Sequence, residues 1–226
     1  GVILSGFTVN GAIDGETGAI LLDNTDNCTI SNNIATNNYW GIKLYNAANN
    51  TISGNVANSN TAQGIGLVGA GTTGNQIVGN TASNNASNGI LLSPGVGGNN
   101  TISDNTVSAN GKNGVSISSS NNTVTNNTIT GNATTNTKGA GIALFDPVSG
   151  NTIQFNTITG NTGYGGVGST SLGTNDISKN WWGSATGTRH TTNPGGTGDK
   201  RWTNRDISLL SYSPWLGKAP GSTPMD

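Results

Sequence analysis

The stretch GIKLY, residues 41–45, places two titratable side chains, Lys43 and Tyr45, on alternate positions of an apolar segment. Residues two apart in a β-strand point to the same face, so both side chains would stand outside while the aliphatic residues between them point inward. Asp23 and Asp26 lie one repeat earlier. General acid–base catalysis needs at least two positioned ionisable groups. These four residues are therefore the candidate catalytic group.

Acidic residues near the start of the sequence raise a second possibility, a calcium site. Asp14, Glu16, Asp23 and Asp26 fall on adjoining repeats, and calcium favours several oxygen ligands. No loop has the dense ligand spacing of a dedicated calcium loop, so carboxylates that stabilise turns are the alternative interpretation. We expect no cofactor, with calcium as the alternative that remains open.

Composition disfavours several other classes of site and partner. One Cys, one His and one Met cannot build a Cys/His zinc motif and provide too few soft ligands for copper. Charged residues make up 8% of the chain and the net charge is −1, so we expect no nucleic-acid partner. No apolar run reaches the roughly 20 residues of a membrane-spanning helix.

A short polar phrase that ends in Asn recurs through the sequence, as in NTISGN (50–55), NTISDN (100–105) and NTIQFN (151–156). The closing asparagines are Asn33, Asn55, Asn80, Asn105, Asn127, Asn156 and Asn180. They follow one another at intervals of 22 to 29 residues, and a Gly-aliphatic-x-aliphatic phrase such as GIKL recurs at similar intervals. Two independent markers therefore share one period, which indicates a repeat architecture.

Each repeat predicts three short strands joined by Gly/Asn turns, because apolar and polar residues alternate within every phrase. Strands of successive coils would pair in parallel about 4.8 Å apart. An Asn at one fixed place in every coil would stack on its equivalents and exchange hydrogen bonds along the column. A leucine-rich repeat has a similar period but would need Leu at several positions and often a helical arc. The sequence therefore predicts an all-β parallel solenoid of about eight coils with a structural ladder of Asn.

These repeats resemble the right-handed parallel β-helix repeat proteins, the NosD-like and pectate-lyase-like group, over roughly residues 1–183. The resemblance implies a right-handed β-helix. It is weak for function, since the group contains lyases, hydrolases, epimerases, adhesins and plain scaffolds. Asn24-Thr25-Asp26 matches the NTD phrase of the pectin hydrolases, but the DD, GHG and RIK phrases of that family are absent. Asp26 is therefore interpreted as a turn carboxylate.

The repeat pattern ends after Asn180, and four of the five Trp residues follow it. An open solenoid end exposes apolar core and unpaired strand edges, which large flat side chains can cover. We therefore expect residues 1–183 to form the β-helix and residues 184–226 to form an irregular C-terminal cap. Trp181 and Trp182 are also candidates for a sugar-stacking platform, because aromatic pairs serve both uses.

The third strand of four successive repeats carries a regular set of hydroxyl groups. Its residues are Thr81, Ser83, Thr106, Ser108, Thr128, Thr130, Thr157 and Thr159. Such a grid resembles the flat surface of ice-binding β-solenoids, although Thr and Ser suit exposed strands in general. We regard these residues as candidate ligand-binding positions.

Few titratable residues occupy the outward positions of the predicted strands, so the leading hypothesis is a non-catalytic extracellular or cell-surface module. It would act as a spacer or bind polysaccharide or other surface proteins. A polysaccharide lyase or epimerase with its site near Lys43 is the first alternative, and an ice-binding protein is the second. The chain begins directly with a strand-like segment at Gly1, so we expect the parent protein to extend upstream.

Overall fold

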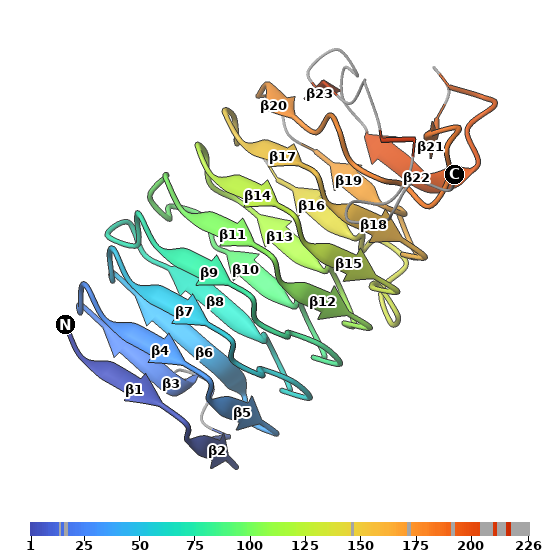
Figure 1. Ribbon diagram of the computed structural model, residues 1–226. Helices are drawn as coiled ribbons and strands as arrows, with labels where there is room; N and C mark the ends of the chain where they lie inside the picture. Colours follow the sequence, from blue (N-terminus) through green and yellow to red (C-terminus); the bar gives the residue numbers. More distant parts are fainter. Residues whose placement is uncertain are drawn as a thin grey trace, which may run out of the picture.

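The computed structural model describes residues 1–13, 15, 18–145, 147–170, 173–190, 193–203, 210–211 and 216–217. Short parallel strands stack into an elongated solenoid, with the N-terminus at one end and the last strands at the other (Figure 1). The described residues contain no helix, and so none that could cross a membrane. The predicted all-β parallel β-helix is confirmed.

Three sheets run along the stack, and successive coils contribute one strand to each. Sheet A contains β1 (Ile3–Ser5), β4 (Thr29–Ser31), β7 (Thr51–Ser53), β9 (Gln76–Val78), β11 (Thr101–Ser103), β14 (Thr123–Thr125), β17 (Thr152–Gln154), β20 (Asn175–Asp176) and β23 (Leu210–Ser211). Sheet B contains β2 (Thr8–Asn10), β5 (Ile34–Thr36), β12 (Thr106–Ser108), β15 (Thr128–Thr130) and β18 (Thr157–Thr159), with single-residue bridges at Val56, Thr81 and Trp181. Sheet C contains β3 (Gly18–Asp23), β6 (Trp40–Tyr45), β8 (Ile65–Val68), β10 (Ile90–Leu92), β13 (Val115–Ile117), β16 (Ile142–Leu144), β19 (Val167–Ser169), β22 (Gly198–Thr203) and β21 (Thr188–Arg189).

The core is a set of aliphatic columns, because each strand turns one face inward. In sheet A, Ile77, Ile102 and Val124 lie in register and are fully buried. Their neighbours within each strand point outward, and Thr101, for example, is half-buried. Burying one aliphatic side chain of this size contributes roughly 1.5–3 kcal/mol. Since each coil buries the aliphatic side chains of the next, the stability of the solenoid depends on the stacking of its coils.

In the regular coils, the bends next to sheets A and B use a residue in the left-handed backbone region followed by a buried Asn. In one coil Gly74, Gly79 and Asn84 have φ of 67°, 65° and 58° and precede Asn75, Asn80 and Asn85. Gly and Asn tolerate this conformation best, which explains their abundance. These three bends lie five residues apart, and a three-residue segment of sheet A or sheet B separates each from the next.

The predicted Asn ladder is confirmed at each of its seven positions. In the repeating unit, Asn105 Oδ1 accepts from the backbone N–H and Nδ2 of Asn80 at 2.8 and 3.0 Å. Asn80 Nδ2 also donates to the Ile52 carbonyl of the previous coil at 2.8 Å. The ladder runs in this way from Asn33 to Asn180. Burial without partners would cost roughly 1–3 kcal/mol per amide, and the ladder removes that cost.

Two further ladders accompany the predicted one. The second comprises Asn38, Asn60, Asn85, Asn110, Asn132 and Asn161. The third comprises Asn50, Asn75, Asn100, Asn122, Asn151 and Asn175, with Cys28 at its first position. All three ladders point the same way, since each Oδ1 accepts from the coil before it. Their amide dipoles are therefore aligned along the solenoid.

Strand pairing continues past residue 183, where we expected the β-helix to end. Strand β22 pairs in parallel with β19, with Val167 opposite Arg201, and β23 pairs with β20. Before β22, residues 184–190 and 193–197 leave the coil and contain β21, which pairs with β22 through an irregular register. The C-terminal segment thus combines a further coil with an excursion.

Candidate functional site

Trp40, Lys43 and Tyr45 form a patch on the outer face of sheet C, which we call the Trp40 patch. The Lys43 Nζ lies 5.3 Å from the centroid of the Trp40 ring, a cation–π distance. Tyr45 follows on the same strand and is 40% exposed. The alternation of β6 turns Ile42 and Leu44 into the core, where both are fully buried. The sequence therefore correctly placed Lys43 and Tyr45 outside.

A glycine on the next coil makes room for the Trp40 ring. Gly66 lies opposite Lys43 in the register of β6 and β8, so a side chain there would also point outward. A Cβ on Gly66 would overlap Cζ3 of Trp40. The indole therefore occupies the space that a side chain at Gly66 would fill, and it extends the patch across two coils.

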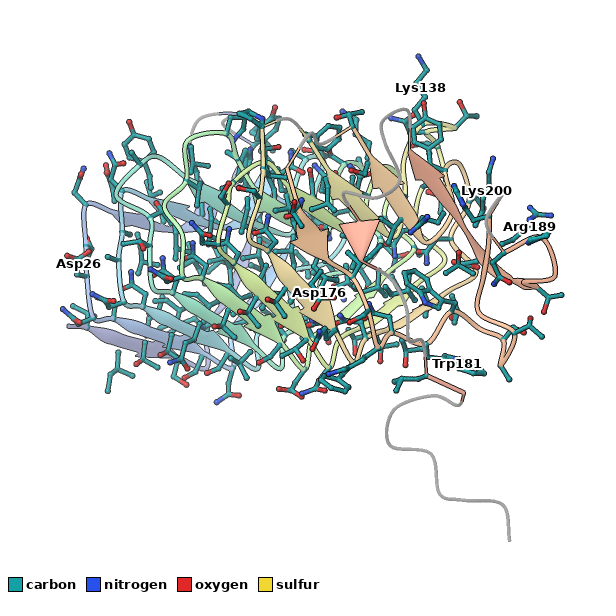
Figure 2. The ribbon with its side chains drawn as sticks, turned by 90° about the horizontal axis from the view of Figure 1, so that it is seen from above. Asp26, Lys138, Asp176, Trp181, Arg189 and Lys200 are labelled. Atoms are coloured by element: carbon teal, nitrogen blue, oxygen red, sulfur yellow. The ribbon has the colours of Figure 1, made fainter. Side chains whose placement is uncertain are left out.

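The two candidate carboxylates, those of Asp23 and Asp26, have different surroundings. Asp23 is exposed and lies opposite Tyr45 in the register of β3 and β6, so it shares the outer face with the Trp40 patch. Asp26 lies in the turn after β3, at the N-terminal end of the stack (Figure 2). Its Oδ1 accepts the backbone N–H of Ala48 from the next coil at 2.6 Å. Its interpretation as a turn carboxylate is confirmed.

The calcium hypothesis depends on residues that the structure describes only in part. Asp14 and Glu16 lie outside the described residues. Within the described part of the chain, no three His, Cys, Asp or Glu side chains gather closely enough to hold a metal ion. Calcium binding by this acidic region stays a prediction.

Beyond the patch, the outer face of sheet C becomes uncharged. Gly66, Leu91, Ser116, Ala143 and Gly168 follow Lys43 in register. None of these side chains can donate or accept a proton near neutral pH. From Gly66 to Gly168, this column of outer positions therefore provides no group for acid–base chemistry.

The hydroxyl columns of sheet B are in register but unequally exposed. Thr106, Thr128 and Thr157 lie opposite one another, as do Ser108, Thr130 and Thr159. Thr106 and Thr128 are exposed, whereas Ser83 is 6% exposed and its Oγ lies 2.9 Å from that of Ser108. The hydroxyl columns are therefore aligned in register, but Ser83 is buried.

The two adjacent Trp residues point in opposite directions. Trp181 bridges to Thr157 as the outward residue of sheet B and is half-buried, and Figure 2 shows it near the C-terminal end. Trp182 is fully buried, continuing the inward column that follows Ile129 and Ile158. Its Nε1 has no hydrogen-bond partner among the described residues. The prediction that Trp182 stacks on sugars is wrong, because strand alternation places it in the core.

The family model for the right handed beta helix region matches residues 18–182. The chain belongs to this family. No curated protein matches it by sequence.

Two solved structures share its fold. The pectate lyase Pel9A superposes with a TM-score of 0.63 at 14% identity, covering 79% of this chain and 53% of that one. The A-module of mannuronan C-5 epimerase AlgE4 from Azotobacter vinelandii superposes with a TM-score of 0.54 at 22% identity, covering 70% and 47%. The chain spans about half the length of each. At these identities the likeness shows the fold alone.

Trp40 is the residue of the patch that sequence reasoning missed. It directly precedes the Gly of the GIKL phrase, outside the alternating positions from which the outward residues were predicted. The sequence does contain one indication of this position. Gly66 occupies the outward position that follows Lys43 in the next coil, and the absence of a side chain there leaves room for a ring.

Proposed function

We propose that this chain is a non-catalytic, extracellular β-helix module that binds polysaccharide through the Trp40 patch. A flat solenoid face suits an extended polymer, and aromatic rings present broad apolar surfaces with polar edges. The ammonium of Lys43 over the Trp40 ring is the observation that carries the proposal. It combines a stacking surface with a cation that can bond to hydroxyl or carboxylate groups.

The surroundings of the patch favour binding over catalysis. Asp26 already accepts a backbone N–H from Ala48, and the neighbouring outer positions of sheet C lack titratable groups as far as Gly168. Acid–base catalysis would therefore rest on Lys43, Tyr45 and Asp23 alone. An extended polymer could instead lie along the sheet without chemical change.

Retention on immobilised polysaccharide tests the proposal. Pectate and mannuronan are the first polymers to examine, since the two structures of this fold carry those names. We expect Trp40→Ala and Tyr45→Ala each to weaken retention roughly tenfold, about 1.4 kcal/mol. Phe145→Ala is the matched control, because Phe145 is 39% exposed and also follows a strand of sheet C. Equal retention of all four proteins, or none by the wild type across a glycan array, would overturn the proposal.

An enzyme is the second candidate, because Asp23, Lys43 and Tyr45 share one face of adjoining strands. A lyase acting there would release unsaturated uronates, and Lys43→Ala would abolish the release. Ice binding is the third candidate and rests on the aligned hydroxyls of Thr106, Thr128 and Thr157. Thermal hysteresis by the purified protein would support it, and its absence would remove it.

A further inference from the structure

A separate pocket opens at the C-terminal end of the solenoid, remote in sequence from the Trp40 patch. It has a volume of about 530 Å³ and lies where β21 and β22 leave the regular coils. Its lining includes Thr162, Arg189, Thr197, Asp199 and Lys200, together with several glycines. Pockets for small organic ligands have volumes of roughly 300–1,000 Å³, so this pocket is larger than an inorganic anion requires.

Two cations flank this pocket side by side. Arg189 of β21 lies opposite Lys200 of β22 in their parallel register, and Figure 2 shows both at the C-terminal end. Both residues are exposed, and among the described residues neither forms an ion pair. Like charges placed opposite each other across two strands are destabilising. An anion held between them would remove that repulsion.

The Asp199 carboxylate, which lines the pocket, already accepts hydrogen bonds from the neighbouring coil. Asp199 Oδ1 accepts the backbone N–H of Gly160 at 2.9 Å. Its Oδ2 accepts the N–H and the Nδ2 of Asn161 at 2.9 and 3.0 Å. Asp199 therefore fixes one wall of the pocket against the coil, and its oxygens face these amides instead of the two cations.

A third positive charge, that of Arg201, is buried next to Lys200 on β22. Arg201 alternates with Lys200 on β22 and is 1% exposed, with its Nη2 3.5 Å from Nδ1 of His190. Burial, and next the charge of Arg201, lower the pKa of His190, so the imidazole adds no charge of its own near neutral pH. His190 thus packs against Arg201 at the edge of the pocket.

We propose that the pocket between Arg189 and Lys200 binds an acidic sugar, with its anionic group between the two cations. Thr162 Oγ1 donates to the Ala133 carbonyl at 2.7 Å, so it offers the sugar an acceptor, and the glycine backbone provides further polar groups. This site is independent of the proposed polysaccharide patch, since it shares no residue with it.

Calorimetric titration with sodium galacturonate tests the site, with galactose, sulfate and phosphate as separate titrants. We expect galacturonate to bind, and galactose to bind at least roughly tenfold more weakly because it lacks the charge. Arg189→Gln and Lys200→Gln should each weaken galacturonate binding roughly tenfold to a hundredfold. Lys112→Gln is the charge-matched control on an exposed turn and should change nothing.

Three results would overturn the proposal. The first is no heat with galacturonate, confirmed by unchanged amide NMR signals of the glycines lining the pocket. The second is an affinity unaffected by Arg189→Gln and Lys200→Gln in variants that keep the wild-type circular dichroism. The third is tighter binding of sulfate or phosphate than of galacturonate, which would make the pocket a site for inorganic anions.

Discussion

Asn161 ends the second amide ladder on a carboxylate: its backbone N–H and its Nδ2 both donate to Oδ2 of Asp199, at 2.9 and 3.0 Å. Each preceding Asn of the ladder donates to another amide instead. Because the ladder dipoles are aligned with their N–H ends towards this terminus, a negative charge there is favourable, as at the N-terminus of an α-helix. Asp199 thus joins strand β22 to the last regular coil.

The pH dependence of stability should report on Asp199. Burial raises the pKa of this carboxyl, and the hydrogen bonds from Asn161 and Gly160 oppose the rise only in part. The folded state therefore binds more protons than the unfolded state between the two pKa values, and stability is lost as pH rises through the folded pKa. We expect Asp199→Asn to abolish this component in urea titrations between about pH 3 and 7.

The test compares the free energies of unfolding of Asp199→Asn and of the wild type at each pH. The free energy of unfolding of Asp199→Asn minus that of the wild type should grow as pH rises. Asp104→Asn, an exposed carboxylate elsewhere on the solenoid, controls for general charge effects. A difference independent of pH would contradict the burial of Asp199.

The ladders should carry a large share of the stability. Asn105→Ala removes the acceptor of Asn80 and the donor to the Ile77 carbonyl, leaving several buried polar groups unpaired. We expect a loss of about 2–5 kcal/mol in urea unfolding. Asn126→Gly is the control, since Asn126 is exposed with φ of 57° and Gly accepts that backbone. Similar losses in the two variants would show that bend conformation matters more than the ladder.

Gly66→Ala should disrupt the Trp40 patch without changing any of its side chains. The added Cβ would overlap the indole, so Trp40 must rotate away from Gly66 and from Lys43. We expect polysaccharide retention to fall roughly as far as in Trp40→Ala, about tenfold, with a shift in tryptophan fluorescence. Gly79→Ala adds a Cβ that meets no other atom and should spare retention. Full retention by Gly66→Ala would place the ligand elsewhere.

The neighbouring Trp residues should differ sharply in their effect on stability. Trp182 is fully buried, so Trp182→Ala should cost about 3–5 kcal/mol through lost packing and a cavity. Trp181 is half-buried on the outer face, and Trp181→Ala should cost about 1 kcal/mol or less. Thermal unfolding of both variants measures the difference. Equal losses would contradict the opposite orientation of the two rings.

Much of the architecture was readable from spacing alone. One ladder was predicted from the closing Asn of each phrase, and NTISGN in fact begins with Asn50 of the third ladder and ends with Asn55 of the first. Asn60 of the second ladder follows five residues later. Three strand residues, one left-handed residue and one buried Asn make that unit of five. A search for Asn at five-residue intervals would have found all three ladders.

The site was less predictable, because it depends on neighbours in the next coil. Alternation placed Lys43 and Tyr45 outside, but the position of the Trp40 ring depends on the absence of a side chain at Gly66. Likewise, the adjacency of Arg189 and Lys200 requires the excursion before β22 to pair with it through an irregular register. Periodicity carries no information about such an excursion, and the sequence therefore indicated only an irregular cap.

The most direct test of the proposed function measures binding and turnover on the same sample. Wild-type protein is incubated with pectate and with mannuronan, retention on each polymer is quantified, and the supernatant is assayed for unsaturated uronates. We predict retention that Trp40→Ala reduces roughly tenfold and no release of unsaturated product. Release that Lys43→Ala abolishes would contradict a non-catalytic binding module and establish an enzyme.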